Sequence, residues 1–259
     1  MLSNRKSIYL DCIGPGTLEE RLKAAAEAGF AAVELPTLLP EERQQAKALF
    51  QKYNLICPSI MTAGAWENIA TSPDPAVRER SAECYKRAVD TAVDMGCDTI
   101  LCVPGGVNAQ ISYEQALENA PKTLRLVLPY AEEKGVTLAI ENVWNKFLVS
   151  PLEMTAFIDS FHSRYVASYF DIGNIAFWGI PQQWIHTLGG RIKRVHIKGF
   201  RMKDFSGFTW SNLPDSTIDW AAVRQALDDV GYDSFITAEL SPDERGLAAI
   251  AEDIDRIFH

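Results

Sequence analysis

The stretch Leu138-Ala-Ile-Glu-Asn-Val-Trp144 begins as an apolar strand and ends on a carboxylate and an amide. A short run of Leu, Ala and Ile without polar alternation is typical of a strand covered on both faces, as in parallel sheets flanked by helices. The run stops at Glu141, a residue that is costly to bury when it is ionised. The purpose of this acid therefore depends on where the fold places the end of the strand.

Seven further runs rich in Val, Ile and Leu recur along the chain, so that with the run at 136–142 they predict eight strands. They lie at residues 7–11, 31–35, 55–60, 98–104, 165–174, 192–200 and 234–240. Amphipathic stretches of helical period separate them. These stretches are 17–29, 41–53, 75–96, 112–135, 150–161, 181–190, 219–231 and 244–258. Strand and helix thus alternate from end to end.

Capping residues bracket the same helical stretches. Thr17, Ser112, Ser150 and Asp219 can accept a hydrogen bond from a first-turn amide, and glycines follow several last turns. Eight strand–helix units in roughly 250 residues fit a closed parallel barrel. We therefore predict one α/β domain over residues 1–259, a single (β/α)8 TIM barrel. A doubly wound open sheet is the alternative.

The composition is that of an ordinary globular protein and limits the classes of partner. The chain has 259 residues, a formal net charge of −9 and 47% hydrophobic residues. The acidic balance argues against a nucleic acid or an anionic membrane as partner. Apolar runs stay short of membrane-spanning length, and five cysteines without a C-x-x-C pair indicate reduced thiols. We expect a cytoplasmic protein.

Polar residues end the last four predicted strands. Glu141 is followed by Asp171 in YFDIGN, His196 in RVHIKGF and Glu239 in ITAEL. In TIM barrels the carboxyl ends of the strands form the mouth of the active site. We therefore expect these four side chains to point at one place.

Three carboxylates that lie close together repel one another unless they take up protons or a cation compensates their charge. Together with one imidazole they form a hard, mostly oxygen donor set that suits Mn, Mg or Co ions, with Zn as a further candidate. We expect one divalent metal ion, Mn before the others, held by Glu141, Asp171, His196 and Glu239.

The motifs at these strand ends resemble those of a known family. IENVW with SPLEM beyond it, YFDIGN, VHIKGF and TAEL are similar to the xylose-isomerase-like TIM barrels. These are sugar and sugar-phosphate isomerases and epimerases, among them D-tagatose 3-epimerase, L-xylulose-5-phosphate 3-epimerase and hexulose-6-phosphate isomerase-like proteins. The resemblance implies the same four metal ligands and a ketose or ketose phosphate as substrate. It also implies that the protein assembles as a homodimer or homotetramer, as relatives often do.

The resemblance further implies that Glu141 and Glu239 are the catalytic acid and base. One would remove a proton beside the ketose carbonyl and the other would return a proton through an enediolate, while the metal polarises the carbonyl. Return from the opposite face gives epimerisation, whereas return to the neighbouring carbon gives isomerisation.

Three further residues are candidates for binding substrate. Free-sugar 3-epimerases of the family carry His three residues after the strand-six Asp, where this chain has Asn174. The Asp-x-Gly-Asn turn resembles the relatives that act on phosphorylated pentuloses. Lys198 and Arg201 follow strand seven and could hold a phosphate group, the Arg with two parallel hydrogen bonds. A solvated basic face is the plain alternative.

Three other functions remain open at this stage. A metal-dependent dehydratase of a cyclitol such as an inosose begins with the same proton abstraction. An abasic-site endonuclease needs more histidines than the four present and a basic face. A non-catalytic sugar-binding barrel would not need an intact ligand set.

Other residues at presumed strand ends and mouth loops receive structural roles. We expect Asp11 and Glu34 to position the first loops, with a hydrogen bond to substrate as the alternative. Aromatic residues in or beside the mouth loops are expected to pack those loops and to exclude water. They are Trp144, Phe177, Trp178, Phe208 and Trp210.

Overall fold

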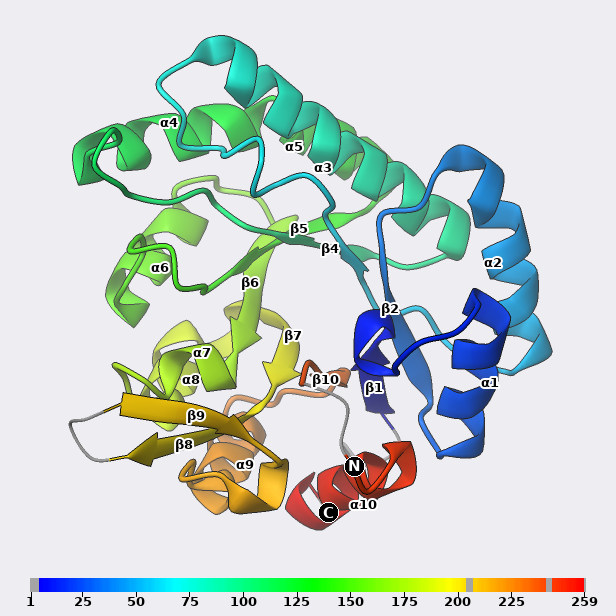
Figure 1. The fold of residues 1–259 in the computed structure, drawn as a ribbon. Helices are drawn as coiled ribbons and strands as arrows, with labels where there is room; N and C mark the ends of the chain where they lie inside the picture. Colours follow the sequence, from blue (N-terminus) through cyan, green and yellow to red (C-terminus); the bar gives the residue numbers. More distant parts are fainter. Residues whose placement is uncertain (1–4, 204–206, 241–243, 259) are drawn as a thin grey trace.

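The computed structural model describes residues 5–203, 207–240 and 244–258. Eight parallel strands close into a barrel in the order β1-β10-β7-β6-β5-β4-β3-β2, and β1 pairs with β10. Figure 1 shows this ring of strands inside a ring of helices. The strands are β1 Lys6–Tyr9, β2 Ala32–Pro36, β3 Ile60–Met61, β4 Thr99–Cys102, β5 Thr137–Glu141, β6 Val166–Asp171, β7 Ile192–Ile197 and β10 Ile236–Ala238. The predicted (β/α)8 TIM barrel is confirmed, and closure excludes the open sheet.

The longer helices lie outside the barrel, close to the predicted stretches. They are α1 Leu18–Glu27, α2 Pro40–Lys52, α3 Pro75–Met95, α4 Tyr113–Arg125, α5 Leu128–Lys134, α6 Pro151–Asp159, α8 Pro181–Leu188, α9 Trp220–Asp229 and α10 Leu247–Phe258. The stretch predicted as one helix at 112–135 is two helices. Pro129 stands in the first turn of α5, where its missing N–H costs nothing, and this favours a new helix start.

Helix termini follow the predicted capping chemistry. Thr17, Ser112 and Ser150 each form a capping box with the residue three positions later, and Asp219 accepts a hydrogen bond from Ala222. Each cap satisfies first-turn amides that have no partner within the helix. The caps therefore fix the residues at which these helices begin.

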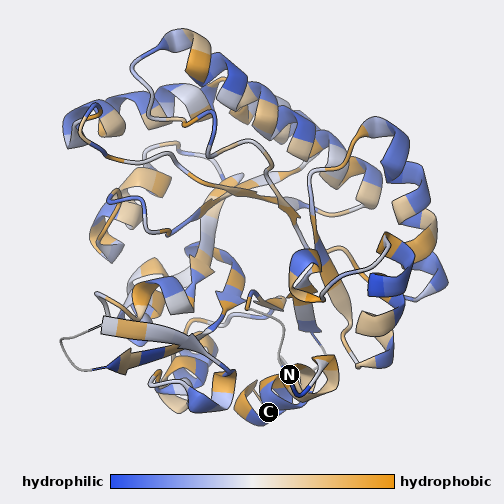
Figure 2. Cartoon of the chain, viewed as in Figure 1, coloured by the Kyte–Doolittle hydropathy of each residue, from blue (hydrophilic) through white to orange (hydrophobic). Residues whose placement is uncertain are grey.

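The core lies inside the barrel and between the barrel and its helices. Every residue of β4, β5 and β6 is buried, and α3 buries Tyr85, Val89 and Ala92, which lie on one helical face. Figure 2 shows hydrophilic and hydrophobic residues interleaved along the outer helices, as expected of amphipathic segments. The cysteines are free thiols, four of them buried. Among the described residues, none of the helices has the length and apolar character needed to cross a membrane.

The observed strands differ from the predicted limits most in three cases. The third is reduced to Ile60–Met61 with a separate bridge between Ala32 and Ile56. The sixth stops at Asp171, because the Asp171 side chain caps the short helix α7, Ile172–Ile175. The seventh stops at Ile197.

Beyond β7 the chain forms an antiparallel hairpin that the sequence did not predict. Its strands are β8 Gly199–Lys203 and β9 Gly207–Ser211. A Cβ atom at Gly199 would lie 2.1 Å from the carbonyl oxygen of Ser211, so the close pairing of the two strands at this position requires glycine. Figure 1 shows the hairpin beside the barrel, at the lower left of the view.

Candidate active site

The four predicted ligands meet at the carboxyl ends of their strands. Glu141 and Asp171 are the last residues of β5 and β6, His196 lies in β7, and Glu239 follows β10 directly. One ligand atom from each lies within 4.8 Å of the others. Adjacent parallel strands in register bring this about, since Asp171 is paired with His196 across β6 and β7. The four side chains therefore converge at one place, as expected from their positions at the strand ends.

The imidazole of His196 lies at the centre of this cluster. Its Nδ1 atom is 3.1 Å from Glu239 Oε2, 3.4 Å from Glu141 Oε1 and 4.0 Å from Asp171 Oδ2. Glu141, Asp171 and His196 are buried, whereas the Glu239 side chain is 26% exposed. The cluster is therefore closed from below and open on the side of Glu239.

Several atoms of the cluster are suited to a metal ion. Asp171 Oδ2, His196 Nδ1 and Glu239 Oε2 are buried, and apart from the ion pairs of the two oxygens with Lys198 they have no hydrogen bond to the described residues. Buried polar atoms of this kind normally have partners. Three carboxylates and one imidazole are a donor set that divalent ions such as Mn²⁺ accept. The residues present thus fit a divalent metal, and the cluster could hold one.

Burial and neighbouring charges shift the pKa values of the three acids in the cluster. Burial, opposed by the His196 hydrogen bond and reinforced by Glu239, raises the pKa of Glu141 to about 7. Burial also raises the pKa of Asp171. For Glu239, burial is outweighed by His196 and Lys198, so its pKa lies well below its usual range. Without a metal ion the cluster would thus hold protons on some of its acids.

Glu34 is part of this site, which the sequence did not indicate. It is fully buried in β2, and its Oε2 atom lies 2.7 Å from Nε2 of His196. Its Oε1 atom accepts hydrogen bonds from Ser59 at 2.7 Å and Tyr169 at 2.8 Å. A carboxylate only accepts, so Nε2 of His196 carries a hydrogen, and Nδ1 is the ring atom that faces the cluster. The available signal was an acid inside the apolar run AVELP.

Asp11 differs from Glu34. Its side chain is mostly exposed and accepts hydrogen bonds from Tyr9 and Arg21, both at 3.0 Å. Asp11 therefore ties the segment after β1 to α1, in keeping with the expected positioning of a first loop.

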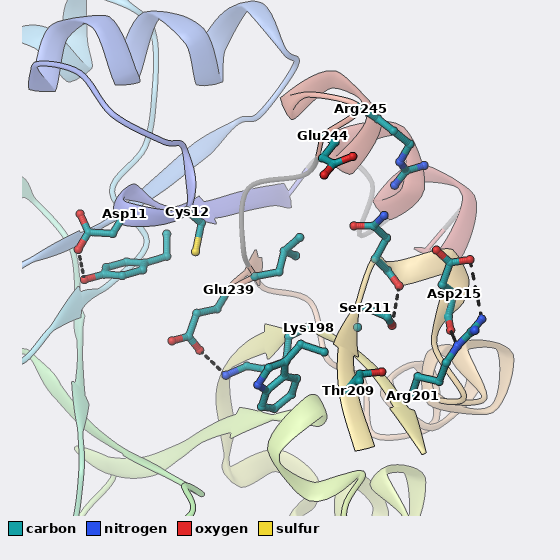
Figure 3. A pocket seen from close by; sticks show the side chains of 15 residues that line it. Asp11, Cys12, Lys198, Arg201, Thr209, Ser211, Asp215, Glu239, Glu244 and Arg245 are labelled. Carbon is teal, nitrogen blue, oxygen red and sulfur yellow. Dashed lines mark hydrogen bonds and ion pairs between the residues drawn. The ribbon is translucent and has the colours of Figure 1, made fainter. Parts of the chain in front are cut away.

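Lys198 points into the cluster. Its Nζ atom lies 2.8 Å from both Asp171 Oδ2 and Glu239 Oε2, and Figure 3 shows the pair with Glu239. Its stem occupies the space beside Gly173, where a Cβ would come within 2.1 Å of it. Burial opposes its charge, but Asp171 and Glu239 outweigh this and raise the pKa of Lys198. The predicted contact of Lys198 with substrate stays a prediction.

Asn142 and Asn174 join the ends of β5 and β6. Asn142 donates to the Asp171 carbonyl at 2.8 Å and accepts from its N–H at 2.9 Å, while Asn174 donates to the Asn142 carbonyl at 3.0 Å. The backbone on either side of Glu141 and Asp171 is therefore fixed. The hydrogen bond to the Asn142 carbonyl gives Asn174 a structural role, and the contact of Asn174 with substrate stays a prediction.

A pocket of about 990 Å³ opens above Glu239 and Lys198 (Figure 3). Arg201 lies on its rim, about half exposed, with Nε donating to the Asp215 carbonyl at 2.8 Å. The remaining walls come from the end of β1 and the residues after it, from the β8–β9 hairpin and the residues after it, and from the segment between β10 and α10. They are formed by Tyr9, Asp11, Cys12, Gly199, Thr209, Trp210, Ser211, Asn212, Asp215, Leu240, Glu244 and Arg245.

A model of the family described as "Xylose isomerase-like TIM barrel" matches residues 22–258 of the chain. The chain belongs to this family. Two similar curated proteins have names that state an activity. The putative L-ribulose-5-phosphate 3-epimerase SgbU of Haemophilus influenzae is 25% identical, over 70% of this chain and 68% of that protein. Inosose dehydratase of Geobacillus thermodenitrificans is 22% identical, over 89% of this chain and 84% of that protein.

Solved structures agree with this membership at the level of the fold. A D-tagatose 3-epimerase-like protein superposes with a TM-score of 0.81 at 18% identity, covering 98% of this chain and 96% of that one. An L-ribulose 3-epimerase superposes with a TM-score of 0.80 at 20% identity, covering 98% and 94%. The family resemblance noted at the strand ends is confirmed.

The mouth of this xylose isomerase-like barrel carries a continuous aromatic cluster. Trp144 packs on Phe208 with ring centroids 4.9 Å apart and stacks on Trp210 at 5.3 Å. Phe177 and Trp178 extend the cluster beside Trp144, so the five predicted mouth aromatics form one connected cluster around Trp144. They pack the hairpin against the loops after β5 and β6, while Trp210 also lines the pocket.

Proposed function

We propose that this chain is a divalent-metal-dependent epimerase or isomerase of a ketose, and that Glu141 and Glu239 exchange a proton with the substrate. The observation that supports it most is the convergence of Glu141, Asp171, His196 and Glu239, whose ligand atoms lie within 4.8 Å of one another. The relatives named as ribulose-5-phosphate 3-epimerases also support this class of reaction.

The proposed reaction uses residues in separate roles. A bound divalent ion, Mn²⁺ before Mg²⁺, Co²⁺ or Zn²⁺, would polarise the ketose carbonyl and acidify the adjacent C–H. Asp171 and His196 would serve only as metal ligands, and His196 is oriented by Glu34. Glu141, on β5, and Glu239, after β10, approach the site from different strands. One removes the proton and the other returns it through an enediolate.

A second candidate is elimination of water from a cyclitol such as an inosose. The similarity to inosose dehydratase favours it. Elimination begins with the same proton abstraction, so the four residues would keep their positions and only the fate of the enediolate would change.

Deuterium exchange in D2O tests both. EDTA-treated protein is reloaded with Mn²⁺, Mg²⁺, Co²⁺ or Zn²⁺ and incubated with ketoses, ketose phosphates and inososes, and each product is analysed by NMR. Metal-dependent incorporation of deuterium beside the ketose carbonyl is expected. A dehydrated inosose without exchange into any ketose would replace the proposal by the dehydratase, and inactivity toward both classes despite bound metal would reject both.

A further inference from the structure

The pocket beyond Glu239 is larger than a single sugar requires. Its volume is about 990 Å³, at the upper end for pockets that bury drug-sized ligands, whereas a hexose has only about 12 non-hydrogen atoms. On the proposed function, a ketose whose carbonyl lies at the Glu141–Glu239 cluster would leave the outer part of the pocket unfilled. The residues of the outer walls therefore indicate which further group is attached to the ketose.

Each positively charged side chain among the described lining residues already has an acidic partner. Lys198 contacts Asp171 and Glu239, Arg201 contacts Asp215, and Arg245 donates to Asp253 at 2.7 Å. The acids that line the same pocket are Asp11, Asp215, Glu239 and Glu244. A phosphate group would have to take a cation from its carboxylate and lie among like charges, which is unfavourable.

The position of these residues in the barrel gives a second argument against a phosphate group. TIM barrels that bind phosphate frequently do so in the loops after strands seven and eight of the barrel, which here follow β7 and β10. The sequence after β10 is Ser-Pro-Asp-Glu-Arg-Gly, residues 241–246, and its described residues Glu244 and Arg245 line the pocket. Glu244 thus lies where a phosphate would be expected, and the neighbouring Arg245 is paired with Asp253.

The hairpin supplies features that suit an uncharged ring instead. Trp210 lines the pocket, and its stacking on Trp144, with an angle of 26° between the rings, fixes its orientation. Thr209 and Ser211 add hydroxyl groups from the same strand. An aromatic surface with a few polar groups beside it is a usual composition for a site that binds a neutral ligand.

We propose that the substrate is an uncharged ketose linked to a second sugar ring, and that the β9 wall around Trp210 binds this second ring. The proposal rests on the proposed function and narrows its substrate class. It places the reacting ketose at Glu141 and Glu239 and excludes the sugar phosphates from the preferred substrates.

Three substrates that differ only at O6 test it. D-Fructose is compared with isomaltulose, which carries glucose on O6 of fructose, and with D-fructose 6-phosphate. We expect kcat/KM for deuterium exchange to be at least tenfold higher for isomaltulose than for either of the others. A higher value for the phosphate would overturn the proposal while the proposed function stands. Absence of exchange from all three would overturn both.

Two substitutions locate the effect. Trp210→Ala should raise KM for isomaltulose about tenfold and leave D-fructose nearly unchanged, whereas Trp66→Ala, at an exposed Trp outside the pocket lining, should change neither. Glu244→Gln should raise kcat/KM for D-fructose 6-phosphate several-fold relative to that for isomaltulose. Equal effects of Trp210→Ala on isomaltulose and fructose would remove the assigned role of the β9 wall. No gain for the phosphate in Glu244→Gln would remove the assigned exclusion of phosphate by Glu244.

Discussion

Glu34 Oε2 lies 2.7 Å from His196 Nε2 in the closed interior of the barrel, on the side of the ring away from the four-residue cluster. Ser59 and Tyr169 hold the other oxygen of Glu34, so the carboxylate has a fixed position. Partners of this kind set the tautomer and raise the basicity of a metal-binding imidazole. Glu34 is therefore a positioning residue for the metal site.

The first prediction concerns this pair. Glu34→Gln removes the negative charge behind His196, and we expect the affinity for Mn²⁺ to fall about 10- to 100-fold, as measured by titration with a competing chelator. Glu27→Gln, at an exposed position on α1, is the matched control. An unchanged dissociation constant in Glu34→Gln would contradict the positioning role.

The second prediction concerns Lys198, whose ammonium group lies 2.8 Å from both Asp171 and Glu239. Removing one member of a buried ionic group leaves the others uncompensated, at a cost of about 3 kcal/mol. We expect Lys198→Met to lower the melting temperature of the EDTA-treated protein and to increase the further stabilisation that Mn²⁺ provides. Thermal melts with and without Mn²⁺ measure both, and Lys122→Met, at an exposed pair on α4, is the control. Equal melting temperatures for the two variants would reject the expectation.

The third prediction concerns an ion pair at the opposite end of the barrel. Asp98 accepts hydrogen bonds from Lys193 and Arg194, both at 2.7 Å. Burial acts to raise the pKa of Asp98, but Lys193, Arg194 and Thr99 outweigh it, so the pKa lies below its usual value. A carboxyl group with a lowered pKa stabilises the fold above its unfolded pKa, and this contribution is lost as the pH falls through the folded pKa.

Asp98→Asn should therefore lower the free energy of unfolding at pH 7 by about 1 kcal/mol, a modest value because the side chain is half exposed. The difference from wild type should stay constant down to about pH 5 and shrink below about pH 4. Urea unfolding at several pH values tests this, with Asp228→Asn, at an exposed position on α9, as control. A difference that does not depend on pH would point to packing rather than charge.

Most of the fold could be predicted because its signals are local. Apolar runs, helical periodicity and caps such as Thr17 and Ser150 each act within a few residues, and the alternation of strand and helix repeats along the chain. The hairpin β8–β9 could not be predicted in this way. GFRMK continues the pattern of strand seven, and the break depends on Gly199 meeting the backbone of Ser211, a contact between residues distant in the sequence.

The same distinction applies to the site. Glu141, Asp171, His196 and Glu239 were found because each ends or nearly ends a strand, and the barrel brings strand ends together. Glu34 was not assigned to the site because its role depends on His196, 162 positions later in the chain. The pairing of Arg201 with Asp215 could not be predicted either, since it requires the path of the chain after β9.

The last prediction separates the two proposed catalytic acids. Glu141→Gln and Glu239→Gln keep a carbonyl oxygen for the metal but lose the ability to accept a proton, so each should lower the rate of epimerisation by about 10³-fold. If the acids act on opposite faces of the enediolate, each variant should still exchange deuterium into one of the two epimers, and the two variants should prefer opposite epimers. Exchange is followed by NMR for both epimers separately.

Two controls make the outcome of that experiment specific. Metal content by elemental analysis shows that loss of rate is not loss of the ion, and thermal melts show that the fold is retained. Near-wild-type epimerisation in either variant would reject the two-glutamate mechanism. Loss of exchange with the same epimer in both variants would instead indicate that Glu141 and Glu239 act on one face, with a single acid moving the proton and the other holding the site together.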